Sequence, residues 1–464
     1  MTTNAPREDE REVREDGHEP QPRKRSILET TLRVLPAHGV LRALEPILPL
    51  LLARWFGRND ATDVYNFAFA VFSFAGSLVF AAYQDSALVP ILAEERLARR
   101  KELPRLIGSV LAHTWAIGGG IATLVALVAL AWFRLRYADP SFALAAKMVL
   151  PFALYLLAMS TRTFFGTVLA AEKRFFVQPV ASFFGLAANI GILWALREKV
   201  GIAIVPVSMV AGEIVTGVVL AWFTLGPLGM KIQLCFDRPP ALVAFGRLIA
   251  AEVSGGAVTR VNPVVDQFMA GLAAVLGAGT LLRLSNDVAM LPTSILQAAL
   301  LPVLLSHLAD DFAARDLVTF RRKVVRSLFS VCGILLAAAA LLYFVRALLL
   351  RFVFLRGQMD AGGVDLMVQL LPFHLVGLAP FGALLILARA HVALKNSTIM
   401  LSMGILNAGC NAAFNIVLLK VMGLPGIALS TSLVQLAVAV VFWFRFERRL
   451  RALGGEMSPP ETSR

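Results

Sequence analysis

The sequence contains little cysteine and little charge. Its 464 residues include three cysteines, and Asp, Glu, Lys and Arg together make up 16%. The three cysteines, Cys235, Cys332 and Cys410, are too few and too far apart for a disulfide framework or a zinc site. The low charge, set against 58% hydrophobic residues and a mean hydropathy of +0.72, excludes an ordinary soluble domain. The chain is therefore predicted to be a polytopic membrane protein.

Motifs of catalysis are also missing from the sequence. It has no phosphate-binding glycine loop, no zinc spacing and no nucleophile elbow, so nothing favours an enzyme and no cofactor is expected. The formal net charge of +13 could indicate nucleic acid, but the basic residues form short clusters between apolar segments. Basic cytoplasmic loops explain that distribution, and we expect no nucleic-acid partner.

Apolar segments recur along the chain at a length that crosses a bilayer. At about 20 residues per crossing, we predict an all-α membrane protein with about twelve transmembrane helices. The predicted segments cover residues 31–56, 64–88, 106–133, 144–170, 178–197, 201–226, 243–274, 279–307, 324–350, 364–390, 397–419 and 424–444. The even number places both termini on one side. The loops on that side contain more Lys and Arg than the loops on the other side, which predicts that both termini are cytoplasmic.

An internal repeat predicts two lobes. Leu88-Val89-Pro90-Ile91-Leu92 resembles Leu300-Leu301-Pro302-Val303-Leu304, and a charged connector ending in basic residues follows each. Two six-helix lobes related by an axis along the membrane normal would enclose a central cavity. The predicted parts are a disordered cytoplasmic tail (1–28), an N-terminal lobe (29–228), a cytoplasmic linker (229–242), a C-terminal lobe (243–446) and a cytoplasmic tail (447–464).

Charged side chains within the predicted membrane segments are the main candidates for function. A charge near the bilayer centre costs about 3 kcal/mol, so Arg42 and Glu45 of the first segment are expected to face a protein-lined cavity. The repeat matches this segment to the seventh, where Arg260 lies at a similar depth. Two guanidiniums at one depth suit a phosphate, although Arg42 and Glu45, three residues apart, could instead neutralise each other.

Other charges within the membrane leave two interpretations open. Arg283 and Asp287 lie four residues apart in the eighth segment and could form a static bridge or a ligand site. Glu252 and Asp266 of the seventh segment are candidates for proton or sodium coupling.

Several short motifs occur in order along the chain. They are Ala53-Arg54-Trp55-Phe56-Gly57, Asp63, Val89-Pro90-Ile91-Leu92-Ala93-Glu94, Val264-Val265-Asp266, Phe320-Arg321-Arg322, Ala388-Arg389-Ala390 and the run from Gly426 to Leu433. Together they resemble the motifs of the bacterial lipid II flippases of the MurJ/MviN type. The resemblance covers about residues 30–450. It implies lobes that alternate between inward-open and outward-open states. It also implies a polyprenyl-diphosphate-linked sugar as cargo, with the head group crossing through the cavity.

The resemblance also assigns site residues. Arg42 matches the arginine of the family's helix-one Ser-Arg pair, and Asp63 matches its acidic residue after Phe-Gly. Our candidate substrate-binding residues are Arg42, Glu45, Arg260, Arg283 and Asp287. Our candidates for gating or ion coupling are Asp63, Glu252 and Asp266.

Departures from the family pattern concern the cargo. Leu48 replaces a second helix-one arginine, Asp287 stands at a helix-eight arginine position, and the family's last two helices are expected to be missing. We predict a flippase of the bacterial inner membrane for a lipid-linked glycan such as lipid II, driven by the membrane potential, H⁺ or Na⁺. Its partners would be membrane lipids and, as a further candidate, glycan-synthesis proteins. Three alternatives stay open: an exopolysaccharide or O-antigen flippase, a cation-coupled drug exporter, and a non-transporting scaffold for glycan synthesis.

Overall fold

The computed structural model describes residues 47–79, 88–98, 102–174, 176–240, 242–243, 245–246, 260–355, 357–394, 396 and 398–457. Within these ranges all regular secondary structure is helical. The first half contains α2 (Ile47–Phe56), α3 (Asp60–Val79), α5 (Leu88–Ala98), α6 (Leu103–Arg136), α7 (Asp139–Ala171), α8 (Val177–Val200), the 3₁₀ turn η1 (Gly201–Ala203) and α9 (Ile204–Leu225). The second half contains α11 (Asn262–Ala270), α12 (Ala278–Ala313), α13 (Leu317–Phe354), α14 (Ala361–Val376), α15 (Leu378–Ala393), α16 (Thr398–Met422) and α17 (Leu424–Met457).

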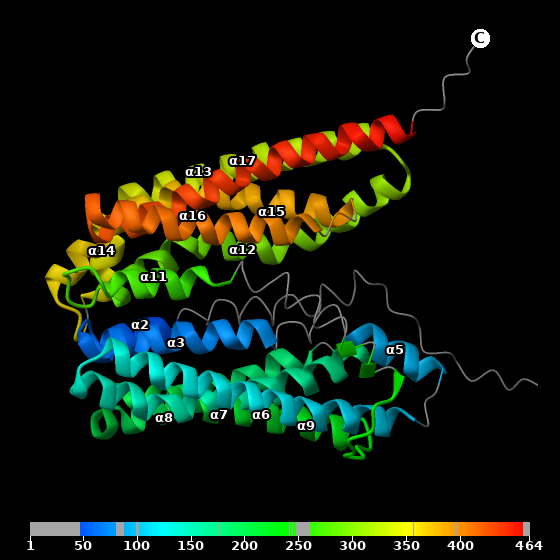
Figure 1. Cartoon of the computed structure of the whole chain (residues 1–464), viewed down its shortest axis with the longest axis horizontal. Helices are drawn as coiled ribbons and strands as arrows, with labels where there is room; N and C mark the ends of the chain where they lie inside the picture. Colours follow the sequence, from blue (N-terminus) through cyan, green and yellow to red (C-terminus); the bar gives the residue numbers. More distant parts are fainter. Residues whose placement is uncertain are drawn as a thin grey trace, which may run out of the picture.

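Each half packs around its own hydrophobic core. One cluster of buried residues draws on α3 and on α5 to α9, and the other on α12 to α17. Figure 1 shows the two halves as two layers of nearly parallel helices, with α2, α3 and α11 between them. This arrangement agrees with the predicted two-lobed helical membrane fold, while the residues at which the lobes were predicted to begin and end stay a prediction.

The short helix α11 contacts both layers. Ala270 belongs to the core of the second half, whereas Val264 and Phe268 pack against the core of the first. The centroid of the Phe268 ring lies 5.8 Å from that of the Trp132 ring of α6. The guanidinium of Arg136, also on α6, lies 5.4 Å from the centroid of the Phe268 ring. The helix α11 therefore packs against α3 and α6 of the first half and against α16 and α17 of the second.

Seven helical stretches in the described part of the chain are long and apolar enough to cross a membrane. Large apolar side chains cover their outer faces, such as Leu127, Trp194 and Phe344, all more than half exposed. A lipid bilayer, and not water, is the solvent that suits such a surface. The protein is thus a multi-pass membrane protein, although the predicted count of twelve crossings is not confirmed exactly.

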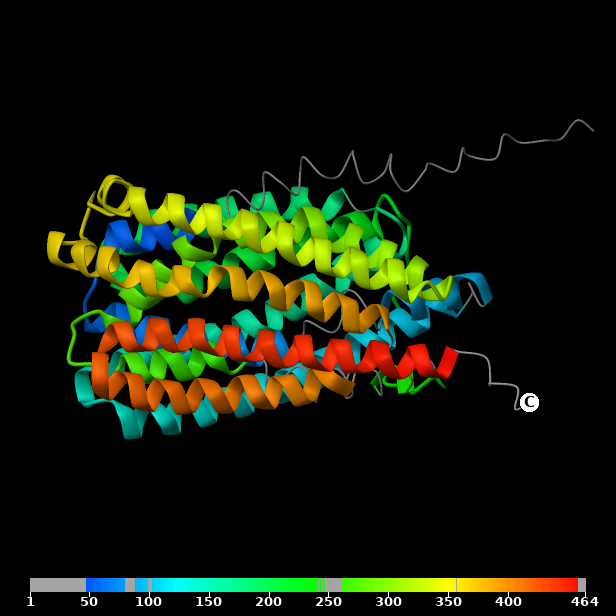
Figure 2. The ribbon, with the colours of Figure 1, turned by 90° about the horizontal axis from the view of Figure 1, so that it is seen from above.

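The helices alternate in direction, so the loops gather at two ends. One end carries the turns α2–α3, α6–α7, α11–α12 and α13–α14, and we call it the latch end. The opposite, far end carries α5, the α12–α13 turn and the end of α17. Figure 2 shows α17 in red and α13 in yellow-green on either side of the segment Ala361–Ala393, which packs against both.

Candidate functional site

The two halves meet through a carboxylate at a helix N-terminus. Asp63 Oδ1, in the first turn of α3, accepts hydrogen bonds from the backbone N–H of Thr280 (2.9 Å) and from its hydroxyl (3.0 Å). Thr280 is the third residue of α12, where backbone N–H groups have no partner within the helix. A negative charge there also interacts favourably with the helix dipole. Asp63, predicted to act in gating, thus joins one half to the other.

Arg283 extends this contact by one helical turn. Its Nη1 donates to Asn66 Oδ1 (2.8 Å), and Asn66 Nδ2 in turn donates to the Thr280 hydroxyl (2.8 Å). The Arg283 guanidinium also lies 4.3 Å from the centre of the Phe69 ring. Its predicted partner Asp287 is 3.9 Å away, a longer separation than that to Asn66. Arg283 is therefore mainly a contact between the halves.

An ion pair closes the latch end. Arg58, in the α2–α3 turn, donates from Nε (2.6 Å) and Nη2 (2.8 Å) to the two oxygens of Asp360, just before α14. Its Nη1 also donates to the Leu276 carbonyl (3.2 Å) of the α11–α12 turn. Such a bidentate arrangement fixes the relative orientation of the two groups. We call the contact between Arg58, Asp360 and Leu276 the latch.

Backbone contacts at the latch leave no space for a side chain. The Gln358 N–H donates to the Arg54 carbonyl at 2.8 Å. A Cβ on Gly57 would lie 2.3 Å from the Gln358 carbonyl oxygen, and the φ of Gly57 is +64°. Glycine meets both requirements because it lacks a Cβ and adopts positive φ without strain.

Replacing Asp360 with asparagine is expected to raise the population open at the latch end about two- to fivefold, since an exposed ion pair contributes about 0.5–1 kcal/mol. The test is the distance between spin labels at Val200 and Val421, exposed positions near the latch end in opposite halves, in a cysteine-free background. Asp365→Asn is the matched control, because Asp365 is 49% exposed against 52% for Asp360 and pairs with Arg351 within one half. Equal distances in both variants would contradict the role of the latch.

The pH dependence of the latch follows from the Asp360 carboxyl. Its hydrogen bond with Arg58 lowers the pKa of Asp360 below its ordinary value. A lowered folded-state pKa gives stabilisation that is complete above the ordinary value, about 3.9, and that is lost as the pH falls through the folded value. Between pH 8 and pH 5, therefore, wild type and Asp360→Asn should show the same pH response.

Of the two arginines predicted to bind phosphate, the structure describes Arg260. Arg260 precedes α11, is exposed, and donates from Nη1 to the Ser77 carbonyl of α3. The substrate-binding candidates Arg42 and Glu45 and the ion-coupling candidate Glu252 lie outside the described residues. The predicted match in depth between Arg42 and Arg260 thus stays a prediction.

Asp266 lies in a polar cluster within the second half. Its Oδ1 accepts from the side-chain amides of Asn411 (3.0 Å) and Asn415 (2.8 Å) on α16, and its Oδ2 accepts from the Thr431 hydroxyl (3.3 Å) on α17. Asn411 and Asn415 are fully buried. Their amide oxygens have no hydrogen-bond partner in the described part of the chain.

The composition of this cluster suits a small cation. One carboxylate, two amide oxygens and a hydroxyl are hard oxygen ligands, the type that Na⁺ and other hard cations prefer. Without a cation, the amide nitrogens of Asn411 and Asn415 donate hydrogen bonds to the Asp266 carboxylate. The amide oxygens of both residues then have no hydrogen-bond partner among the described residues. Rotation of either amide would turn its oxygen towards Asp266. The cluster can therefore satisfy a charged Asp266 with or without a cation.

A second charged pair lies inside the first half. Arg162 Nε on α7 is 2.5 Å from Glu213 Oε2 on α9, and about one fifth of each side chain is exposed. The pair joins two helices of the same half. It thus belongs to the packing of that half and not to the contact between halves.

Two of the pockets that described residues line lie between the halves. One of about 20 Å³ touches Arg283, Asn66 and Thr280, and one of about 200 Å³ touches Asp63 and Asp60. A wider central cavity stays a prediction, because residues 1–46, 80–87 and 247–259 are not described.

Comparison with protein families identifies relatives along most of the chain. Residues 52–459 match the family model of the lipid II flippase MurJ. A probable lipid II flippase MurJ from Rhizobium tropici is 24% identical over 417 residues, which are 86% of this chain and 77% of the relative. One from Borreliella burgdorferi is 18% identical over 416 residues, 86% of this chain and 79% of the relative.

Solved structures share the fold. A lipid II flippase MurJ in an inward closed conformation superposes with a TM-score of 0.72, at 17% identity, over 91% of this chain and 90% of the other. An inward-facing multidrug transporter of the MATE family gives a TM-score of 0.74 at 13% identity, over 92% and 99%. At such low sequence identities, the two superpositions show a shared fold. The match of the family model over residues 52–459 establishes that this chain belongs to the MurJ lipid II flippase family.

Proposed function

We propose that this protein moves a polyprenyl-diphosphate-linked glycan precursor, lipid II or a close analogue, across the bacterial inner membrane by alternating access. Family membership supports this function. The observation that carries the mechanism is the position of the contacts between halves. In the described part of the chain, every hydrogen bond and ion pair between the two halves comes from α2, α3 or the turn joining them.

This position fits a transporter closed at the latch end. Contacts that can break as a group allow one end of the bundle to open while the other closes. Asp63 and Arg283 then act as gate residues, and transport requires that their hydrogen bonds break and re-form once per cycle. The protein acts as a transporter and not as an enzyme in this proposal.

Arg260 is our described candidate for the diphosphate head group. It lies beside α3 between the halves and donates to one carbonyl, whereas a guanidinium carries five N–H donors. The remaining donors can bind phosphate oxygens. Arg42 is proposed as its partner from the first half, from the sequence alone.

We propose Asp266 as the residue that binds the coupling ion, H⁺ or Na⁺. It links α11, which contacts the first half, to α16 and α17. Binding of a cation would change how α11 is held and hence the balance between the two facing states.

The membrane potential is a second proposed source of energy for the change between facing states. We propose that the latch end faces the periplasm and that both termini face the cytoplasm, in line with the basic loops at the far end. A potential of 100 mV contributes about 2.3 kcal/mol per charge moved.

Binding of lipids to the purified protein tests the proposal. Native mass spectrometry would compare lipid II, a polyprenyl-diphosphate oligosaccharide, a polyprenyl monophosphate and a lipophilic cationic drug. We expect selective binding of the diphosphate lipids, weakened about ten- to a hundredfold by Arg260→Ala and by Arg42→Ala, since each charged hydrogen bond contributes about 1.5–3 kcal/mol.

Arg134→Ala is the control for these variants, because Arg134 lies at the latch end and pairs with Asp139 on the surface. Binding of the drug in preference to the diphosphate lipids would favour a drug exporter. Binding that is indifferent to both arginines would contradict the proposed head-group site.

A further inference from the structure

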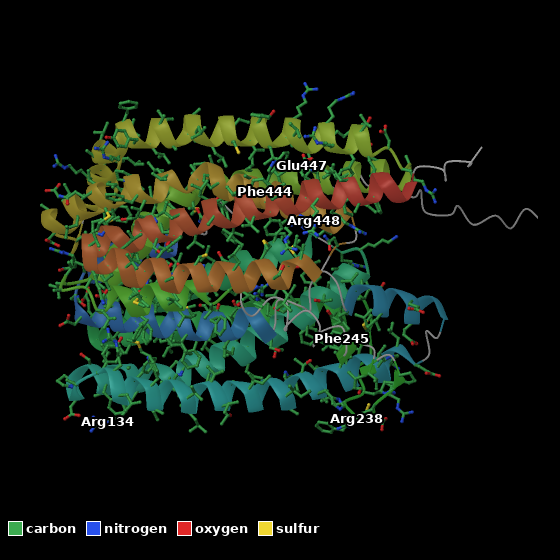
Figure 3. All side chains as sticks on the ribbon, turned by 45° about the horizontal axis from the view of Figure 1, so that its top comes forward. Arg134, Arg238, Phe245, Phe444, Glu447 and Arg448 are labelled. Atoms are coloured by element: carbon green, nitrogen blue, oxygen red, sulfur yellow. The ribbon has the colours of Figure 1, made fainter. Side chains whose placement is uncertain are left out.

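A basic groove lies outside the path between the halves. It has a volume of about 690 Å³ and lies between the start of α13 and the end of α17, at the far end of the bundle. Figure 3 labels Glu447 and Arg448 on neighbouring positions of α17, and Glu447 is the one of the two that lines the groove. We call it the α13–α17 groove.

The charge of the groove is strongly positive. Arg321, Arg322, Arg326 and Arg451 line it together with a single carboxylate, that of Glu447. Arg321 Nε pairs with Glu447 at 2.9 Å and so joins α13 to α17. Within the described part of the chain, Arg322, Arg326 and Arg451 form no ion pair. Their three guanidiniums can therefore bind an anion.

An apolar surface continues from the groove along the outside of α13. Val318 and Val325 line the groove, and Phe329 and Leu336 follow at helical spacing. Phe329 is 77% exposed and Leu336 59%. Side chains spaced in this way share one face of a helix. A ligand seated in the groove could therefore extend an apolar chain over that face.

The height of the groove matches the headgroup region of a bilayer. The 38 residues of α13 extend about 57 Å at 1.5 Å per residue, well beyond a hydrocarbon core of about 30 Å. The groove arginines of α13, Arg321, Arg322 and Arg326, lie in its first three turns, and the exposed Phe329 and Leu336 follow. This order, charged and then apolar, is the order of a phospholipid from headgroup to acyl chain.

We propose that the α13–α17 groove is a binding site for an anionic phospholipid. The phosphate accepts hydrogen bonds from Arg322, Arg326 and Arg451, and one acyl chain lies along Phe329 and Leu336. Basic pockets between transmembrane helices bind such headgroups because each guanidinium attracts phosphate and donates hydrogen bonds in pairs. The net positive charge selects an anionic headgroup over a zwitterionic one.

The test compares lipid binding by the full-length protein and by a triple variant, Arg322→Gln/Arg326→Gln/Arg451→Gln. Native mass spectrometry with added phosphatidylglycerol or phosphatidylcholine reports the lipids bound. Wild type should bind phosphatidylglycerol in preference to phosphatidylcholine. The triple variant should lose that preference and bind phosphatidylglycerol about a hundredfold more weakly, since each of the three basic residues contributes on the order of fivefold. The variant Arg134→Gln/Arg346→Gln/Arg351→Gln removes the same charge at the latch end and should bind as wild type does.

Three outcomes would overturn the proposal. The first is an equal loss in both triple variants, which would indicate a general effect of charge. The second is retention of phosphatidylglycerol by the Arg322→Gln/Arg326→Gln/Arg451→Gln variant as strong as that by wild type, which would place the lipid outside the groove. The third is a dimer that forms in wild type and not in the Arg322→Gln/Arg326→Gln/Arg451→Gln variant, which would assign the groove to a second copy of the chain.

Discussion

Replacing Asp266 with asparagine is expected to abolish the dependence of this protein on its coupling ion and to slow transport about tenfold or more, because hydrogen bonds to a charged group contribute about 1.5–3 kcal/mol each. Asp266 is the only charged member of the cluster with Asn411, Asn415 and Thr431. Asparagine has nearly the same volume but no negative charge. The cluster therefore remains filled, while a cation loses its counter-charge.

Two measurements check this result. The melting temperature of the purified protein is recorded in sodium chloride and in choline chloride, and at several pH values, and transport is recorded in proteoliposomes under the same conditions. Wild type should respond to Na⁺ or to pH, and Asp266→Asn to neither. Asp365→Asn, which removes a surface carboxylate paired with Arg351, should respond as wild type does. An unchanged ion response in Asp266→Asn would exclude this cluster as the coupling site.

Replacing Asp63 with alanine is expected to open the latch end far more than loss of the Asp360 carboxylate. The change removes the acceptor of two hydrogen bonds from Thr280 and leaves the first turn of α12 without its cap. Charged hydrogen bonds contribute about 1.5–3 kcal/mol, which corresponds to a shift of about ten- to a hundredfold in the population open at the latch end. Transport should fall because the closed state is no longer reached often enough.

The spin-label distance between Val200 and Val421 measures this shift directly. Asp60→Ala is a close control, because Asp60 is the first residue of the same helix and is exposed. It should leave the distance unchanged. Asp63→Asn should give an intermediate value, since its amide oxygen can still accept from Thr280 but carries no charge. The same distance in Asp63→Ala and in wild type would contradict the role of Asp63 as a gate.

The sequence predicts the membrane fold and individual charged residues better than it predicts their partners. Composition and apolar segments suffice for a two-lobed helical membrane protein, because the bilayer restricts spanning structures to so few forms. Asp266 stands out because a charge in such a segment is costly, and Asp63 stands out through its place in a motif that resembles the family's. Both lie in polar contacts between helices in the structure. Their functional roles remain predictions.

The partners were missed for physical reasons. Arg58 and Asp360 are 302 residues apart, and two charges in surface turns give no sign that they meet. Asn411 and Asn415, by contrast, lie four residues apart in an apolar helix, and that spacing could have been noticed. Arg283 was assigned to Asp287 by the same spacing rule, yet tertiary contact with Asn66 gives the shorter bond. Spacing along the sequence therefore predicts side-chain partners poorly where a helix packs against another helix.

A flipping assay tests most directly whether this protein translocates a lipid-linked diphosphate between leaflets, as we propose. Fluorescent lipid II would be placed in proteoliposomes, and its exposure to a reagent added outside would be followed over time. We predict exchange that is much faster than in empty liposomes, slowed by Arg260→Ala and Asp63→Ala, and unaffected by Asp365→Asn. Exchange no faster than in empty liposomes, for lipid II and for other diphosphate-linked glycans alike, would contradict the account.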